Sequence, residues 1–372
     1  MSQSDCGNRP RVLFLFQLPP PVHGASMVNL SIKDSEYISS RVDARYVNIS
    51  PAREMSDLGK LTISKFFSTI YIFIKCIFYY LKLKPSLVYM TLSPHGFAFW
   101  KDALILQVLK IFGAKTVVHL HGKGINSEVS GSKIKLYIYK AIFKGVDVIH
   151  LSKSLFSDIN LVFDKNMSLT EVNNGVRDHG FIRNYCTKIP VFLYLSNLEP
   201  TKGADTLIEA INLLGATYEG KFKVKIVGKI TNVQYNNNLI KLVDERLNKS
   251  IEFVGPLYGI DKHKVFLDSD VFVLPTRFRN ECFPLSILEA MSYGLPVIST
   301  YEGAIPDIID HGVTGHLFHS YDASMLATLI TEYIDNPGII SKNGLNGSMK
   351  YKDKYTIKCF EQKFVSVIKS LT

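Results

Sequence analysis

Short apolar runs alternate with amphipathic stretches along the first half of the chain. The apolar runs are rich in β-branched residues and short, as strands buried on both faces are, and they predict strands at 11–17, 42–49, 87–92, 116–120, 146–151 and 169–172. Apolar residues at helical spacing predict helices around 25–39, 62–83, 97–112, 131–144 and 153–162. Such an alternation predicts a doubly wound parallel sheet.

The same pattern restarts in the second half. Residues 183–190 (RNYCTKIP) lack periodicity and end in a proline, so we expect a linker there. Further strands are predicted at 191–196, 222–227, 251–254, 271–274 and 296–299. Helices are predicted near 203–214, 235–248, 261–268, 284–292, 304–310 and 322–335. The fold class is therefore α/β, with two Rossmann-like domains facing across a cleft and ligands at the carboxyl ends of the strands.

These patterns divide the 372 residues, which are too many for one comfortable core, into two domains and a tail. We expect an N-terminal domain over 1–185 and a C-terminal domain over 190–350. The tail at 351–372 carries apolar residues at helical spacing, so we expect a helix that packs back on the first domain.

Composition supports a globular chain from a reducing compartment. The hydrophobic fraction is 47% and the charged fraction 20%, and the five cysteines show no short spacing typical of metal sites or disulfide frameworks. The first apolar run is closed by prolines and predicts a strand rather than a signal peptide. The stretch 63–81 is long enough to cross a membrane, but Lys65 and Lys75 lie inside it, so a buried or membrane-facing helix is the better prediction.

The net charge of +10 is confined to the first half of the chain. Residues 1–185 hold 23 Lys and Arg against 13 Asp and Glu, whereas 186–372 hold 20 of each kind. This asymmetry is either a bias that favours solubility or an attraction to an anionic surface, which could be membrane or nucleic acid.

The stretch NECFPLSILEAMSYGLPVI at 280–298 places two glutamates eight positions apart. Pro284 suits the first turn of a helix, which leaves Glu281 in the preceding loop and Glu289 in the second turn. Even on one continuous helix, the two would be separated by ~12 Å and rotated by ~80°, so they cannot share a proton or a metal. The amides at the helix start favour an anion. The layout suits a nucleotide-sugar, and the alternative is two exposed glutamates on an ordinary amphipathic helix.

Three weaker features lie at predicted strand ends. Lys202-Gly203 at a strand-to-helix turn suits a phosphate clamp, although most Lys-Gly pairs are ordinary turns. Gly24 opens a helix after the first strand and would allow close approach of a ligand, or serve only a tight turn. His119 and His121 share one side of a strand. His121 is expected at the ligand end and His119 in the core; a zinc pair would need a third ligand, and none is evident nearby.

Other phosphate and metal motifs are absent from the sequence. It contains neither G-x-G-x-x-G nor a Walker loop. Its one D-x-D, at 268–270, precedes a predicted strand, whereas a metal motif for a sugar-nucleotide should follow one. We interpret it as a helix-to-strand turn.

Taken together, the stretches over 191–318 resemble glycosyltransferase family 4. LSNLEPTKGADTLIEA is similar to that family's strand–loop–helix with basic phosphate-binding residues. ECFPLSILE fits its E-x7-E pattern, and EAMSYGLPVISTYEGAIPDIIDHGVTGHLF resembles the stretch that follows. PPPVHGAS and HLHG are similar to its glycine loop and its catalytic-region histidine. The resemblance implies the GT-B fold and retaining sugar transfer, of the kind found in bacterial surface-polysaccharide biosynthesis.

Roles for residues of the second domain, which would bind the nucleotide-sugar, follow from this resemblance. Lys202 would bind the donor diphosphate, and Glu281 would contact the sugar hydroxyls near the reacting centre. Glu289 would bond the ribose hydroxyls. Sugar and phosphate would also be held by the amides of Phe283, Leu285 and Ser286.

The first domain would hold the acceptor, and two of its residues would contact the donor. Gly24 would let a loop approach the diphosphate, and His121 would lie near the transferred sugar, which makes it a catalytic candidate together with Glu281. One donor-site position departs from the family, which often has an arginine where this chain has Asn197. The phosphate clamp would then depend on Lys202, helped by Arg277 or Arg279.

The resemblance implies an enzyme that moves a hexose or N-acetylhexosamine from a UDP- or GDP-sugar. No cofactor and no divalent metal are expected. The basic first half and the apolar stretches 63–81 and 133–144 indicate peripheral binding to an anionic membrane at its cytoplasmic face. We expect a lipid-linked or oligosaccharide acceptor, in the assembly of O-antigen, lipopolysaccharide or capsule, and no nucleic acid.

Two kinds of alternative remain. One is another enzyme on this fold, such as a sugar-nucleotide epimerase, which needs no acceptor, or a phosphorylase. The other is a non-enzymatic nucleic-acid or membrane-binding protein that uses the basic half. That reading leaves the pattern over 191–318 unexplained.

Overall fold

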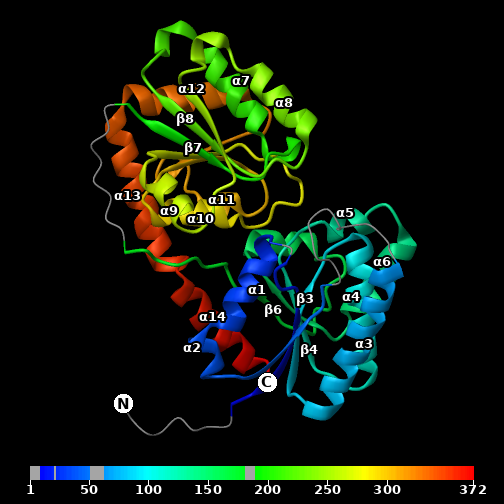
Figure 1. The fold of residues 1–372 in the computed structure, drawn as a ribbon. Helices are drawn as coiled ribbons and strands as arrows, with labels where there is room; N and C mark the ends of the chain where they lie inside the picture. The colour runs from blue at the N-terminus through cyan, green and yellow to red at the C-terminus, as the bar shows by residue number, and fades with distance from the viewer. Residues whose placement is uncertain (1–8, 21, 51–62, 181–188) are drawn as a thin grey trace, which may run out of the picture. The chain divides into compact units, whose positions relative to one another are not determined.

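The computed structural model describes residues 9–20, 22–50, 63–180 and 189–372, with side chains of the third helix described from residue 67. The chain folds into two compact units. The first comprises residues 1–174 and 358–372, and the second comprises residues 175–357. Each unit holds a six-stranded, fully parallel sheet (Figure 1).

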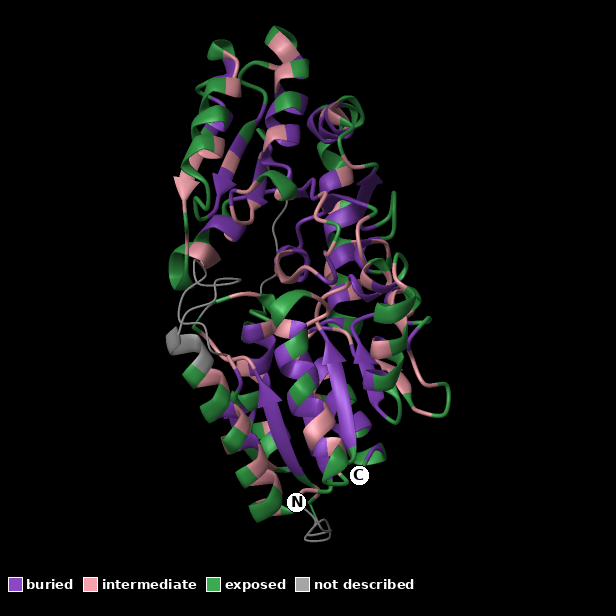
Figure 2. Ribbon diagram, turned by 90° about the vertical axis from the view of Figure 1, so that its right-hand side faces the viewer, coloured by how far each residue is buried: buried purple, intermediate pink, exposed green. Residues whose placement is uncertain are grey.

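The first sheet has the order β2-β1-β3-β4-β5-β6. Its strands are β1 (Arg11–Phe16), β2 (Asp43–Asn48), β3 (Leu87–Leu92), β4 (Thr116–Leu120), β5 (Asp147–His150) and β6 (Leu169–Glu171). Its helices are α1 (Gly24–Asp34), α2 (Glu36–Ser39), α3 (Ile63–Leu83), α4 (Gly96–Ile111), α5 (Ile125–Val129), α6 (Lys133–Phe143), the 3₁₀ helix η2 (Lys153–Asp158) and α14 (Ile357–Ser370). Every residue of β3, β4 and β5 is buried, as central strands covered on both faces require (Figure 2).

The second sheet has the order β12-β11-β10-β7-β8-β9. Its strands are β7 (Val191–Leu195), β8 (Lys223–Val227), β9 (Ile251–Gly255), β10 (Val271–Leu274), β11 (Val297–Thr300) and β12 (Gly315–Phe318). Its α-helices are α7 (Ala204–Leu214), α8 (Val233–Leu242), α9 (Gly259–Leu267), α10 (Leu285–Ser292), α11 (Ile305–Ile308), α12 (Ala323–Asp335) and α13 (Pro337–Lys354). Three short 3₁₀ helices complete the unit, η3 (Pro200–Lys202), η4 (Gly215–Tyr218) and η5 (Glu245–Leu247).

Two predicted helices differ from the observed ones, and two observed elements were not predicted. The helix predicted at 25–39 is divided at Ser35, which is extended and whose hydroxyl accepts a hydrogen bond from the amide of Ile38, so a second helix begins there. The helix predicted at 153–162 is the 3₁₀ helix η2. β12 and α13 were not predicted at all.

The unit boundaries also differ from the predicted domains. The first unit ends at Asn174 rather than at 185, because Val176 is tied to the second unit: its amide bonds the carbonyl of Tyr355 and its carbonyl accepts from the hydroxyl of Tyr351. Residues 351–357 therefore belong to the second unit, and the final helix begins at Ile357. Most of the predicted linker at 183–190 lies outside the described residues.

Helix α14 packs within the first unit. The ring of Phe364 lies 6.3 Å from that of Phe14 in β1 and 5.4 Å from that of Tyr89 in β3, and both Phe360 and Phe364 are buried. Glu361 accepts a 2.5 Å hydrogen bond from the hydroxyl of Ser35. The last residues of the chain thus complete a core built by its first strands.

A buried ion pair stabilises α4 in the first unit. The ammonium of Lys101 lies 2.7 Å from Oδ1 of Asp102 and donates to the carbonyl of Ile49, also at 2.7 Å. Both side chains are at most 3% exposed. Asp102 also accepts from the amide of Ser93 at 3.2 Å, which ties the end of β3 to α4.

We expect Lys101→Ala to lower the free energy of unfolding of the first unit by about 3 to 5 kcal/mol, because it leaves the Asp102 carboxylate buried without its counter-ion. The chain's single tryptophan, Trp100, lies beside this pair, so urea unfolding followed by its fluorescence reports on this unit. Lys115→Ala, at an exposed position of the same unit, is the control and should change little. Equal stability of the two variants would contradict a structural role for the pair.

Among the described residues, none of the helices combines the length and the apolar composition that crossing a membrane requires.

Candidate nucleotide-sugar site

The loop between β10 and α10 in the second unit brings together two residues predicted from the sequence. Glu281 lies four positions before α10, is 8% exposed, and its Oε2 lies 2.8 Å from the Lys202 ammonium. Lys202 is the last residue of η3, and its ammonium also lies 4.5 Å from the centroid of the Phe278 ring. Oε2 of Glu281 accepts a further, longer bond of 3.4 Å from the hydroxyl of Thr276. A cation and a carboxylate are thus held together where β7 and β10 end.

Two glycines allow this close packing of loops. Gly203 follows Lys202 with a φ of +77°, and a Cβ there would lie 2.0 Å from the carbonyl oxygen of Pro275. Gly303 has a φ of +58°, and a Cβ there would lie 2.2 Å from the carbonyl oxygen of Glu281. Any other residue would push these backbones apart. Both glycines therefore fix the positions of Lys202 and Glu281.

The start of α10 differs in detail from the prediction. Pro284 is the residue that precedes the helix, with extended backbone angles, rather than part of its first turn. Leu285 and Ser286 are the first two helical residues and are half-buried. The Phe283 ring is buried and packs edge-on against Tyr355 at 5.7 Å, so its side chain belongs to the core and only its backbone is suited to a ligand.

Glu289 lies in the second turn of α10 and is paired with a residue that the sequence did not single out. Both of its carboxylate oxygens lie 2.7 Å from the ammonium of Lys262, on α9, and both side chains are 29% exposed. Beside them, Nδ1 of His263 lies 2.5 Å from the hydroxyl of Tyr293. Burial, together with the nearby Glu289 carboxylate, raises the pKa of Tyr293 to about 12, so this hydroxyl stays protonated.

The structure shows the contacts of two other residues that were considered for the phosphate clamp. Asn197 is half-buried just after β7, and its carbonyl accepts from the amide of Glu199 at 3.0 Å. Arg277 is engaged elsewhere, because its guanidinium lies 2.6 Å from the carboxylate of Asp205 and donates to Thr206 at 3.0 Å. The expectation that Arg277 helps Lys202 therefore has no support from its contacts.

In the first unit, His121 directly follows β4, and both of its ring nitrogens are buried without a hydrogen-bond partner among the described residues. Its ring lies 4.1 Å from that of His119, whose Nδ1 is 2.6 Å from the hydroxyl of Tyr89. His119 is fully buried, as a core histidine should be. At the end of the neighbouring strand, His150 accepts from the amide of Leu151 at 2.9 Å.

Burial depresses the basicity of these imidazoles. It lowers the pKa of His121 to about 3, helped by His150 and His23, and that of His150 to about 3. Burial and the two neighbouring histidines also hold the pKa of His119 well below 6.5. At neutral pH all three are therefore uncharged, and His121 has one nitrogen that can donate and one that can accept, which suits a sugar hydroxyl.

A pH dependence follows from these lowered pKa values. Between pH 6.5 and 3 the unfolded chain binds more protons than the folded one, so the free energy of unfolding falls as the pH falls. From pH 7 to 5.5 we expect a loss of about 1 kcal/mol for each of the three imidazoles. Urea unfolding followed by Trp100 measures it, and His121→Gln should reduce the slope by the contribution of one imidazole. A slope that stays the same in this variant would contradict the assignment.

Gly24 is the first residue of α1, which begins after β1 and the loop that follows it. The space where a Cβ would lie is open, with no heavy atom within 4 Å among the described residues. The preceding His23 caps the helix, because its Nδ1 accepts from the amide of Ser26 at 3.4 Å. Backbone at Gly24 is thus accessible, as close approach of a ligand requires.

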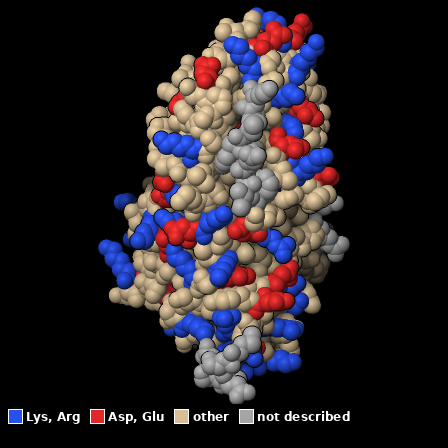
Figure 3. All heavy atoms as spheres, turned by 90° about the vertical axis from the view of Figure 1, so that its left-hand side faces the viewer, with Lys and Arg blue, Asp and Glu red and all other residues tan. Residues whose placement is uncertain are grey.

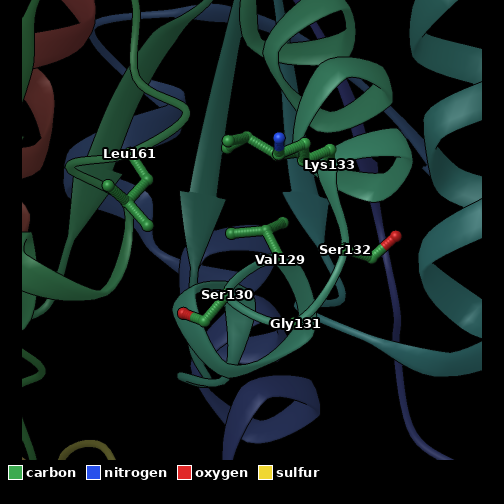
Figure 4. Close-up of a pocket in the computed structure, with 7 residues that line it drawn as sticks. Val129, Ser130, Gly131, Ser132, Lys133 and Leu161 are labelled. Carbon is green, nitrogen blue, oxygen red and sulfur yellow. The ribbon is translucent and has the colours of Figure 1, made fainter.

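A separate hollow of about 330 Å³ lies beside α5 and α6 (Figure 4). It is lined by Val129, Ser130, Gly131, Ser132, Lys133, Leu136 and Leu161. None of the residues predicted to bind the nucleotide-sugar is among these lining residues. The Asp268-Ser269-Asp270 motif has a structural role. Asp270 accepts a hydrogen bond from the amide of Val191 at 2.9 Å, which joins β10 to the start of β7.

Comparison with known proteins finds one family over the second unit. Residues 182–349 match the family model of glycosyl transferases group 1. This segment of the chain is similar to that family. The matched segment contains Lys202, Glu281 and Glu289, and the match confirms the resemblance predicted over 191–318.

Relatives and solved structures agree with this similarity. The amylovoran biosynthesis glycosyltransferase AmsK of Erwinia amylovora is 31% identical over 146 residues, which cover 37% of this chain and 34% of AmsK. A glycosyltransferase of Rickettsia africae shares the fold at a TM-score of 0.76 and 17% identity, over 98% of this chain and 99% of that one. Anabaena HepE, in complex with UDP and glucose, shares it at a TM-score of 0.71 and 18% identity, over 97% and 100%.

These structural matches confirm the predicted GT-B fold with two Rossmann-like domains. The sequence matches are shorter. They span 36%, 34% and 16% of the length of the first three curated relatives, and they lie at 29 to 31% identity.

Proposed function

We propose that this protein is a retaining glycosyltransferase. It moves a hexose or an N-acetylhexosamine from a UDP- or GDP-sugar to a lipid-linked saccharide, during assembly of a surface polysaccharide at the cytoplasmic face of the membrane. The observation that carries the proposal is the pair of Lys202 and Glu281 at the start of α10, inside the group 1 segment. HepE, with the same fold, binds UDP and glucose, and AmsK acts in polysaccharide biosynthesis.

In this proposal, donor binding uses three parts of the second unit. The ammonium of Lys202 and the free amides at the start of α10 hold the diphosphate. Glu281 accepts hydrogen bonds from hydroxyls of the transferred sugar, and Glu289 from those of the ribose. Lys262 orients Glu289, because it holds both carboxylate oxygens at 2.7 Å. In the first unit, neutral His121 bonds a sugar hydroxyl and Gly24 lets backbone approach the diphosphate.

The chemical step breaks the bond between the anomeric carbon and the diphosphate oxygen. Negative charge grows on the leaving nucleoside diphosphate, and Lys202 with the α10 amides stabilises it. Both carboxylates of the site are engaged by lysines, which disfavours either as a covalent nucleophile. We therefore propose a front-face reaction in which the leaving phosphate accepts the acceptor's proton. The anomeric configuration of the product, read by NMR, tests this step: retention is expected, and inversion would exclude it.

A thermal-shift screen against UDP-, GDP-, ADP- and CMP-sugars tests the donor class. We expect one UDP- or GDP-sugar to raise the melting temperature, in the presence of a metal chelator as well as in its absence, because the site supplies its own positive charge. If no nucleotide-sugar shifts the transition, the proposed function fails. If a shift appears only with added divalent metal, the metal-independent mechanism fails and the transferase assignment stays.

A further inference from the structure

Three neighbouring helices of the first unit carry an unusual set of exposed apolar side chains. On α3 the exposed ones are Phe67, Ile70, Tyr71, Ile74, Phe78 and Leu81, each between 41 and 66% accessible. Their spacing of three or four residues aligns them along one side of the helix. The opposite side contributes Ile72 and Cys76 to the core. Helix α3 is thus apolar toward the sheet and apolar toward the outside.

Helix α4 continues this surface. Phe97, Trp100, Leu104 and Ile111 are between 43 and 82% exposed and again recur at helical spacing. The two helices are adjacent, because the hydroxyl of Tyr80, on α3, donates to the carbonyl of Phe112 at 3.2 Å, directly after α4.

Helix α6 lies on the other side of α4. The rings of Phe99 and Tyr139 stack with centroids 4.1 Å apart, and the amide of Gln107 donates to the carbonyl of Ile142. Its outward residues Ile134 and Tyr137 are 75 and 76% exposed. Helices α3, α4 and α6 therefore form one continuous layer, which we call the three-helix face (Figures 1 and 2).

Charge on the three-helix face has one sign. Its three helices contain a single acidic residue, Asp102, which is buried and paired with Lys101. Lysines stand among the apolar residues: the ammonium of Lys75 lies 5.7 Å from the Tyr71 ring centroid, and that of Lys82 lies 5.6 Å from the Phe78 ring centroid. On α6, Lys133 and Lys140 are exposed. The surface seen from the left-hand side of Figure 1 differs, because acidic and basic side chains are interspersed there (Figure 3).

We propose that the three-helix face is the surface by which this protein docks on an anionic phospholipid bilayer, with its apolar side chains among the acyl chains and its lysines at the lipid phosphates. Single exposed apolar residues are ordinary, but a contiguous patch of this extent marks an interaction surface. Lysines whose stems run beside aromatic rings place their charge at a headgroup layer. Trp100 suits the boundary between that layer and the apolar region. A protein partner would not require this uniformly positive charge.

This inference deepens the proposed function, on which it rests for the lipid-linked acceptor, and names the bilayer as the partner of the first unit. It makes no use of Lys202, Glu281 or His121. Membrane docking and donor binding can therefore be measured and can fail separately.

The experiment is flotation of the full chain with vesicles of phosphatidylglycerol and phosphatidylcholine, compared with phosphatidylcholine alone. We expect flotation with the anionic vesicles and weakening by salt. Trp100 is the chain's only tryptophan, so its emission should shift to shorter wavelength when the face enters the lipid. The variant I74S/F78S should bind at least about tenfold more weakly. The variant K75Q/K82Q should also bind the anionic vesicles about tenfold more weakly at low salt.

The control variant L345S/M349S alters exposed apolar residues of the second unit, 56 and 61% accessible, and should float like the unaltered protein. Urea unfolding and the donor thermal shift should match across all variants, which excludes misfolding as the cause of lost binding. If the unaltered protein does not float, or floats without a change in Trp100 emission, the proposal is wrong. It is equally wrong if I74S/F78S leaves flotation unchanged, or if this variant instead converts a dimer into a monomer, which would assign the face to a second copy.

The outcomes also separate this proposal from the proposed function. Donor binding without flotation would contradict the docking proposal and leave the transferase assignment intact. Flotation by a protein that binds no nucleotide-sugar would contradict the transferase assignment and leave the docking proposal intact.

Discussion

Lys202→Ala should lower the rate of nucleoside diphosphate release by about 10²- to 10³-fold. Among the described residues, Lys202 is the cation that the ion pairs place against Glu281, 2.8 Å from the carboxylate, whereas the guanidinium of Arg277 is bound to Asp205 and position 197 is an asparagine. We therefore expect stabilisation of the leaving diphosphate to depend mainly on this ammonium. The loss should appear in kcat, because the charge on the diphosphate grows during bond cleavage.

The measurement is turnover with the nucleotide-sugar selected by the thermal-shift screen. Lys241→Ala, an exposed lysine on α8, is the matched control and should behave like the unaltered enzyme. Lys202→Arg should recover part of the activity, because the charge is kept while the geometry of the contact with Glu281 changes. A fall of less than about tenfold in Lys202→Ala would show that other groups carry the leaving-group charge.

Glu281→Gln should reduce kcat by about 10²-fold while the donor binds almost as tightly as before. The substitution keeps the shape of the side chain and removes the negative charge that would accept hydrogen bonds from the sugar hydroxyls. We expect Lys202 and the start of α10 still to hold the diphosphate, so that the ground-state complex persists. Because Glu281 is only 8% exposed, the solvent cannot replace its lost charge.

Separate determination of kcat and of donor affinity by calorimetry checks this expectation. Glu209→Gln, on the exposed side of α7, is the control. If donor affinity fell in Glu281→Gln as far as kcat did, Glu281 would be a ground-state contact and not a residue that acts on the reacting sugar.

Sheet strands were the part of the fold that sequence predicted best. β3 and β4 begin and end where the pattern placed them, because runs such as LVYMTL are mostly apolar and every one of their residues is buried. Helix α13 was not predicted, because its local sequence does not favour a helix. Its sequence contains three glycines and a proline, all poor helix formers, and it is stabilised by packing: Gly347 lies 3.9 Å, measured from its Cβ position, from Met291 in α10.

For the site, the sequence located individual residues but not their partners. The resemblance singled out Lys202 and Glu281 separately, and only the fold of β7 and β10 brings these residues, 79 positions apart, to 2.8 Å. Lys262 carries no motif, and its contact with Glu289 depends on how α9 packs beside α10. Arg277 was considered for the clamp because of its charge, whereas its contact with Asp205 could be known only from the structure. Which side chains contact one another is decided by the tertiary structure, and local sequence patterns do not contain this information.

The most direct test of the donor site is a crystal structure of the protein with the nucleotide-sugar that gives the largest thermal shift. We expect the diphosphate against the Lys202 ammonium and the amides at the start of α10, with the ribose hydroxyls on Glu289 and the sugar hydroxyls on Glu281. A donor bound elsewhere, with the Lys202–Glu281 and Lys262–Glu289 pairs free of contact to it, would contradict the proposed donor site.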